Sequence, residues 1–155
     1  MSSTLFTLGY QQRNLFEFLD LLQGAKINVL VDVRATAWSH KPGFSKSALT
    51  HALAEIGIEY IHAAFAGNPK RFRTEAKSHQ ECLKKYGLYL TQRIDIVETF
   101  EALLLEHLKA SKRICLTCFE RHPDDCHRAI LADVWRRRGR RQVHHLAPDG
   151  APRLP

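Results

Sequence analysis

Hydrophobic residues follow two patterns along this chain of 155 residues. Some form short continuous runs, which are typical of strands buried in a parallel sheet, and others recur at three- and four-residue spacing, which is typical of amphipathic helices. The continuous runs predict strands over residues 4–8, 29–33, 58–62, 113–117 and 142–146. The spaced positions predict helices that follow Asn14 and Ser45, and further helices over residues 80–89, 94–108 and 125–138.

Several helix ends carry recognisable signals. Asn14 has a glutamate three residues later, which is the capping-box pattern at the start of a helix. Ser45 is expected to cap the second helix and Gly57 to end it. Asp124 and Asp125 are expected to cap the last helix, because short acidic side chains accept hydrogen bonds from its first free amides.

Strands that alternate with helices predict an α/β fold, with three layers in the order α/β/α and a mostly parallel sheet of about five strands. The polar segment over residues 64–80 is expected to form an irregular excursion. No internal repeat or linker divides the chain, so we expect a single α/β domain over residues 1–146. A flexible C-terminal tail is expected over residues 147–155, which contain three prolines.

The composition is that of a soluble globular protein, with 45% hydrophobic and 25% charged residues. No apolar run approaches the roughly 20 residues of a membrane span, so no membrane partner is expected. The first residues lack the basic start, apolar stretch and cleavage site of a signal peptide. The four cysteines are therefore expected to be thiols rather than disulfides, and the location to be cytoplasmic.

The formal net charge of +7 is unevenly placed, because residues 111–145 hold nine Lys and Arg residues against four Asp and Glu residues. Such a bias suits phosphate-bearing partners, including nucleotides and nucleic acid. The candidate nucleic-acid-binding residues are Arg136, Arg137, Arg138, Arg140 and Arg141. The alternative is a solvated basic end of the last helix, which complements the helix dipole.

Polar residues follow several of the predicted strands. Tyr10 lies just beyond the first strand, Arg34 beyond the second and Cys118 beyond the fourth, while His62 ends the third. The carboxyl ends of parallel strands lie along one edge of a sheet, where α/β proteins place their ligand sites. We therefore expect these segments to meet in a cationic cleft that binds a phosphate-bearing ligand.

Asp32 and Arg34 lie two residues apart on one strand, so their side chains point to the same face. Asp32 either braces Arg34 in an internal ion pair or orients it to bind a phosphate or carboxylate through two hydrogen bonds. Asp32 is also a candidate general acid or base. Lys41 and Ser45 are further candidates for anion binding, because their loop leads into a helix N-terminus.

The segment from Cys118 to Arg128 holds reactive side chains between a strand and a helix. Nearby cations favour the thiolate form of Cys118, which makes it a candidate nucleophile; the alternative is an inert, half-buried cysteine. Glu120 is a candidate general acid or base if burial raises its pKa. His127 and Arg128 open the last helix, where side chains and free amides together bind phosphate.

The same segment also contains metal-ligand types. Cys118, Cys126 and His127 offer three ligands and His122 a fourth, but their spacing matches no common zinc motif. The adjacent side chains of Cys126 and His127 are also expected to diverge on a helix. We therefore predict neither a metal nor a cofactor.

Together these segments resemble the domain of unknown function 488 family, a group of small prokaryotic α/β proteins. The resemblance covers the chain from Thr7 to about Leu146. It rests on short segments in a specific order, namely Thr7 to Tyr10, Val31 to Arg34, Pro42 to Ser45, Gly57 to Tyr60, Cys118 to Glu120 and Cys126 to Arg128. It implies the α/β fold and marks Arg34, Cys118, Glu120, Cys126, His127 and Arg128 as motif positions, but it implies no activity.

Three functions of different classes are consistent with these observations. The first is an enzyme that acts on a phosphodiester or glycosidic bond of a nucleotide or nucleic acid, with Glu120 or Asp32 as general acid or base. The second is a non-catalytic nucleic-acid-binding module that uses the arginine run. The third is a thiol-dependent, rhodanese-like transferase that uses Cys118, which rests on fold analogy alone.

Overall fold

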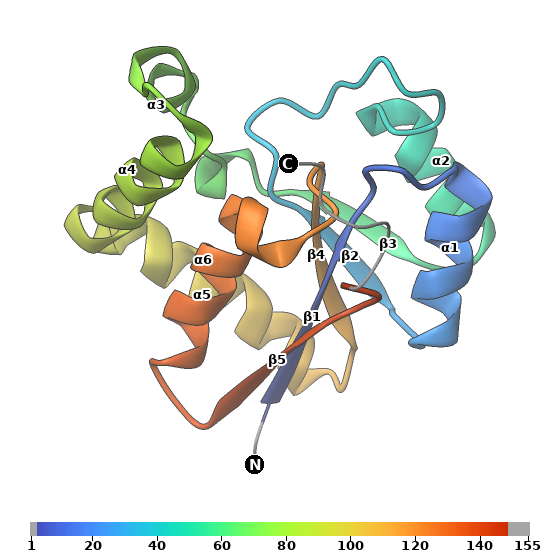
Figure 1. The fold of residues 1–155 in the computed structure, drawn as a ribbon. Helices are drawn as coiled ribbons and strands as arrows, with labels where there is room; N and C mark the ends of the chain where they lie inside the picture. The colour runs from blue at the N-terminus through green and yellow to red at the C-terminus, as the bar shows by residue number, and fades with distance from the viewer. Residues whose placement is uncertain (1–2, 149–155) are drawn as a thin grey trace.

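A five-stranded parallel sheet forms the centre of the computed structural model, which describes residues 3–148 (Figure 1). Its strands are β1 (Ser3–Gly9), β2 (Val29–Asp32), β3 (Glu59–His62), β4 (Ile114–Cys118) and β5 (Arg141–His145). They lie in the order β3-β2-β4-β1-β5, and every neighbouring pair is parallel. The predicted α/β class and parallel sheet are confirmed.

Helices follow the strands in the predicted alternation. They are α1 (Leu15–Gly24), α2 (Lys46–Glu55), α3 (Lys70–Glu75), α4 (His79–Gln92), α5 (Ile94–Lys109) and α6 (His127–Arg136). Two short 3-10 helices are η1 (Ala64–Ala66) and η2 (Pro123–Asp125). The prediction of an irregular excursion over residues 64–80 is wrong in part, because η1 and α3 lie within it. Among the described residues, none of these helices is long and apolar enough to cross a membrane.

Two hydrophobic cores lie on opposite faces of the sheet, so the molecule has the predicted three layers. Helices α1 and α2 cover one face, where Leu8 and Leu30 point, and helices α4, α5 and α6 cover the other, where Val31 and Leu116 point (Figure 1). The alternation of Leu30 and Val31 between the cores follows from the two-residue period of a strand. Both faces are apolar, which explains why the strands read as continuous hydrophobic runs.

The predicted start of α1 is confirmed by its cap, because the Asn14 side chain accepts a hydrogen bond of 2.8 Å from the amide of Glu17. Ser45 does occupy the cap position of α2, but its side chain makes no capping bond. Its Oγ instead accepts a hydrogen bond of 3.0 Å from the amide of Ser39, which folds the preceding loop back on itself.

The predicted cap of the last helix is wrong. Asp124 and Asp125 lie in η2, and α6 begins after Cys126, whose Sγ accepts from the amide of Arg128 at 3.5 Å. The physical reason is Pro123, which sits at the start of η2 and favours a separate short turn before the helix. The capping atom is therefore a cysteine sulfur rather than a carboxylate oxygen.

The end of the described chain contacts the loop that precedes α1. The carbonyl of Ala147, the first residue of the predicted tail, accepts a hydrogen bond of 2.8 Å from Arg13. Residues 149–155, where the rest of the predicted tail falls, lie outside the described residues.

Candidate ligand-binding cleft

The carboxyl ends of β1, β2 and β4 stop at the same level, because Gly9 pairs with Cys118 and Asp32 with Thr117 in the sheet. A cavity of about 590 Å³ opens at this edge. The topology predicted that the strand ends would meet, and the cavity brings them together, since Arg34, Cys118, Glu120 and His127 all line it.

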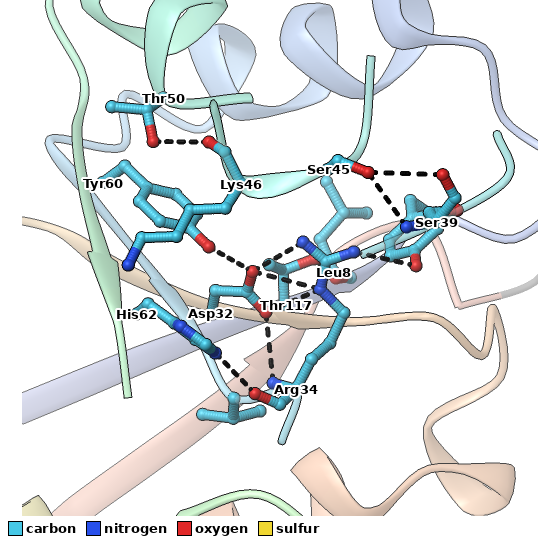
Figure 2. A network of polar contacts seen from close by, with 12 residues as sticks. Leu8, Asp32, Arg34, Ser39, Ser45, Lys46, Thr50, Tyr60, His62 and Thr117 are labelled. Atoms are coloured by element: carbon cyan, nitrogen blue, oxygen red, sulfur yellow. Dashed lines mark hydrogen bonds and ion pairs between the residues drawn. The ribbon is translucent and has the colours of Figure 1, made fainter. Parts of the chain in front are cut away.

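Asp32 and Arg34 form a buried bidentate ion pair, shown in Figure 2. Arg34 donates from Nε at 2.9 Å and from Nη2 at 2.7 Å, and the Tyr60 hydroxyl donates to the same carboxylate at 2.5 Å. Asp32 is fully buried and does not line the cavity, so its carboxylate anchors Arg34 rather than facing a ligand. The internal brace considered from the sequence is therefore present.

Arg34 itself still lines the cavity, although its side chain is only 7% exposed. Its Nη1 donates to the hydroxyl of Tyr10 at 3.1 Å. Burial alone would lower the pKa of Arg34, but the hydrogen bonds and charge of Asp32 outweigh it and raise the pKa. Arg34 is thus a fixed, permanently charged group at the edge of the cleft.

The loop between β2 and α2 covers one side of the cavity. Lys41 lines it and donates from Nζ to the carbonyl of Tyr10 at 3.1 Å, whereas Ser45 faces the loop and does not line the cavity. Burial and the charges of Arg13 and Arg121 lower the pKa of Lys41, although Glu17 opposes them. Of the two predicted anion-binding residues in this loop, only Lys41 is placed to contact a ligand.

Arg128 is almost fully buried and holds the loop that follows β4. Its Nη1 donates to the carbonyl of Glu120 at 2.5 Å and its Nη2 to the carbonyl of Arg121 at 3.3 Å. Burial lowers the pKa of Arg128 to about 10, which leaves it charged at neutral pH. Arg128 does not line the cavity, so its position gives it a structural task rather than the predicted contact with an anion.

The same loop presses against the end of β1, where Gly9 allows the close approach. A Cβ atom on Gly9 would collide with the carbonyl group of Glu120. The amide of Tyr10 donates to the carbonyl of Cys118 at 3.2 Å, which continues the β1–β4 pairing beyond the sheet. A side chain at position 9 would therefore displace Glu120 from the cleft.

Glu120 places a half-buried carboxyl group on the cavity wall, and one of its oxygens lies 3.6 Å from the sulfur of Cys118. Burial raises the pKa of Glu120, although the charges of His79 and Arg128 oppose the shift. Burial thus favours the protonated form, as a general acid requires.

Cys118 and Cys126 are joined by a disulfide, so the prediction that the cysteines are thiols is wrong for this pair. Cys82 and Cys115 are free thiols, as predicted, and both are buried. The pairing arises because the end of β4 and the start of α6 lie side by side at the edge of the sheet, which sequence spacing does not reveal. In this bonded form Cys118 has no thiolate for a nucleophilic attack.

His127 lies beside the same two sulfurs. Its Nε2 is 2.7 Å from the carbonyl oxygen of Val33, and burial lowers its pKa to about 4, so the imidazole is neutral. One ligand atom each from Cys118, Cys126 and His127 all lie within 4.8 Å of one another. The expected divergence of Cys126 and His127 is wrong, because Cys126 has extended backbone angles of −128° and 138° and is not yet helical.

The polar residues that the segment over residues 64–80 contributes to the cavity were not predicted from the sequence, namely Asn68, Arg73 and His79. Asn68 is buried and donates to the sulfur of Cys82 at 3.3 Å, but its Oδ1 has no hydrogen-bond partner in the described part of the chain. These residues come from the segment over residues 64–80. Its basic composition was visible, but no hydrophobic pattern indicated that it folds over the sheet edge.

The arginine run lies at the opposite edge of the sheet, where Arg141 begins β5 beside Ser3. Four of its members are already paired with two carboxylates. Asp133 binds Arg136 and Arg137 at 2.7 and 3.0 Å. Glu101 binds Arg138 and Arg141 at 3.1 and 2.6 Å.

Comparison with known proteins identifies a family. The model of the family described as "Domain of unknown function DUF488" matches residues 14–135, which include the Asp32–Arg34 pair and most of the cleft. A search of curated proteins and a search of solved structures found no match.

Proposed function

Since the chain belongs to the DUF488 family, whose description states no activity, we propose its function from the cleft itself. The cleft binds a nucleotide or a phosphate-bearing end of a nucleic acid. Glu120 acts there as general acid or base on a phosphodiester or glycosidic bond of that ligand. The observation that carries this proposal is the convergence of cations, aromatic rings and one carboxyl group on a single cavity.

The cations that line the cavity support the proposal that it binds phosphate. Arg34, Lys41 and Arg73 line the cavity, whereas Glu120 is the only acidic residue among the described residues that line it. Arg34 has five N–H donors, and the bonds to Asp32 and Tyr10 engage one hydrogen on each nitrogen, so N–H groups remain for an anion. Binding phosphate at this edge also agrees with the general position of ligand sites in parallel sheets.

Aromatic and amide groups of the cavity support the proposal that it binds a nucleotide base. Trp38 and Phe119 line the cavity and are 59% and 45% exposed, so each offers a ring face on which a base can stack. Such stacking contributes roughly 1–3 kcal/mol per base. The unpaired Oδ1 of Asn68 is an acceptor for an N–H group of the base, which would satisfy a buried polar atom.

The position of Glu120 supports a catalytic task. Its carboxyl group lies on the wall of the same cavity, and Arg128 fixes the backbone of its loop. A proton donor or acceptor held beside a bound nucleotide is what cleavage of either bond requires. Gly9 contributes to this placement, because the absence of a side chain lets the backbone carbonyl of Glu120 lie against β1.

Calorimetric titration tests the binding step, with nucleoside monophosphates and the matching nucleosides as ligands. We expect the monophosphates to bind more tightly, and Arg73→Ala to lower their affinity about tenfold while Lys109→Ala, an exposed control on α5, leaves it unchanged. Glu120→Gln should still bind and should lose turnover. Equal affinity for nucleosides and monophosphates would contradict the proposal. So would an equal loss of affinity in Arg73→Ala and Lys109→Ala.

The alternatives have weaker support. The arginine run is largely occupied by Asp133 and Glu101, which counts against a nucleic-acid-binding face there. A thiol-dependent transferase requires reduction of the Cys118–Cys126 bond before any turnover. We also propose a cytoplasmic location, where the Cys118–Cys126 bond would be reduced and all four cysteines would be thiols. Fractionation of cells followed by detection of the protein tests this location.

A further inference from the structure

Two sulfurs and an imidazole converge beside the cleft, and Cys118 and His127 line it. Cys118 ends β4, Cys126 precedes α6 and His127 is the first residue of that helix. One ligand atom from each lies within 4.8 Å of the others, and the three residues are 1%, 1% and 9% exposed. Thiolate and imidazole together form the ligand set that Zn²⁺ and similar soft cations prefer.

The backbone spacing of the two cysteines suits a shared metal. Their Cα atoms are 7.4 Å apart, whereas most disulfides join Cα atoms roughly 4.4–6.8 Å apart. Two thiolates on one zinc ion have their sulfurs about 3.8 Å apart, given tetrahedral geometry and Zn–S bonds of about 2.3 Å. Ligands to a common metal therefore need wider Cα spacing than bonded sulfurs do.

The hydrogen bond of His127 prepares its ring for a metal. The Val33 carbonyl accepts only, so the Nε2 that lies 2.7 Å from it must carry the proton. The lone pair of the neutral ring is then on Nδ1. A metal-binding histidine typically has this arrangement, with its second nitrogen bonded to a backbone carbonyl.

Neighbouring groups complete the environment of the sulfurs. Arg128 donates from Nη1 to the sulfur of Cys118 at 3.5 Å, which favours the thiolate that a metal requires. Cys118 and His127 also line the cavity, so a metal bound to them would have a side open to the cleft. Glu120 stands beside that side, 3.6 Å from the Cys118 sulfur.

We infer that Cys118, Cys126 and His127 form a binding site for Zn²⁺ or another thiophilic divalent cation when the Cys118–Cys126 bond is reduced. A thiol or phosphine reductant supplies two electrons, and two protons convert the disulfide to two thiols. The cation then replaces both thiol protons, which are released to solvent. Three protein ligands leave a fourth position for water or ligand, as in catalytic zinc sites.

Cobalt titration of the reduced, chelator-treated protein tests this inference. We expect one Co²⁺ per chain, with sulfur-to-cobalt charge-transfer absorption that one equivalent of Zn²⁺ removes. Cys126→Ser and His127→Asn should each weaken Co²⁺ binding at least tenfold. Cys115→Ser, at a free cysteine that does not line the cavity, should bind as the unaltered protein does.

Circular dichroism shows whether each variant is folded. If a variant does not fold, the cobalt titration of the unaltered protein still tests the inference. Absence of charge-transfer absorption in the reduced, unaltered protein would overturn the inference. So would absorption of full intensity in a folded Cys126→Ser variant. These titrations contain no nucleotide, and the inference does not depend on the proposed function, so failure of one leaves the other measurable.

Discussion

The two edges of the sheet use arginine in opposite ways. At the carboxyl edge, Arg34 and Arg128 are isolated in the sequence, buried, and fixed by a carboxylate or by backbone carbonyls. At the amino edge, the arginines over residues 136–141 are adjacent in the sequence and largely solvent-facing. Their charges are offset by Asp133 and Glu101.

This difference shows that the density of positive residues along a sequence does not measure the charge that a ligand meets. Four arginines of the run share two carboxylates contributed by α5 and α6. In the cleft, cations from two segments far apart in the sequence line the same cavity as one half-buried glutamate. Placement by the topology of the sheet, rather than clustering, therefore creates the electropositive site.

The largest effect is expected from Gly9→Ala at the carboxyl edge. The new Cβ meets the backbone carbonyl group of Glu120, which cannot turn away as the end of a flexible side chain can, and it also approaches Nη1 of Arg128. We expect a loss in the free energy of unfolding on the order of 4 kcal/mol, measured by urea denaturation. Gly24→Ala at the end of α1 is the matched control, because its Cβ would meet nothing within 4 Å. Equal stability of the two variants would show that the loop after β4 moves freely away from β1.

A smaller loss is expected when Arg128 is replaced by methionine. The apolar side chain keeps much of the packing but leaves the carbonyls of Glu120 and Arg121 without their donor. We expect the free energy of unfolding to fall by about 2–3 kcal/mol. Arg137→Met at the amino edge removes an arginine that is 65% exposed and should change stability by less than about 0.5 kcal/mol. Comparable losses in the two variants would erase the difference between buried and exposed arginines.

The affinity for a nucleoside monophosphate is expected to depend on the cations at the carboxyl edge and not on those at the amino edge. Neutralising the run with Arg136→Ser, Arg137→Ser and Arg140→Ser should leave the affinity for a nucleoside monophosphate within about twofold, because these residues lie away from the cleft. The measurement is the same calorimetric titration, with Arg73→Ala as the variant that removes a cation from the cleft. A larger loss in the triple variant than in Arg73→Ala would place the phosphate at the amino edge and favour the nucleic-acid-binding alternative.

The sequence predicted what depends on local pattern. Continuous apolar runs identified the strands, and strand order along the chain implied that Arg34 and Cys118 approach one edge. It did not predict contacts made across long separations, such as Arg73 over the cleft or the carboxylate of Glu101 beside Arg138. Those contacts depend on how helices cross over the sheet, and no spacing within the chain encodes that.

The smallest effect on stability is expected when the carboxylate of Glu101 at the amino edge is removed. This change tests whether Glu101 offsets the charge of the arginine run. Hydrogen bonds from Arg138, and then from Arg141, lower the pKa of Glu101 below its ordinary value of 4.5 despite the opposing effect of burial. Because the pKa is lowered in the folded state, ionised Glu101 stabilises the protein at pH values above 4.5. This stabilisation is lost as the pH falls below 4.5 and through the pKa of the folded state.

Glu101→Gln should therefore reduce the free energy of unfolding by about 1 kcal/mol at neutral pH, and the difference from the unaltered protein should shrink in acid. Urea denaturation of both proteins at neutral and acidic pH measures it. A difference that stays constant with pH would mean that Glu101 acts through packing rather than charge. The arginine run would then carry its positive charge without compensation, and the contrast between the two edges would no longer hold.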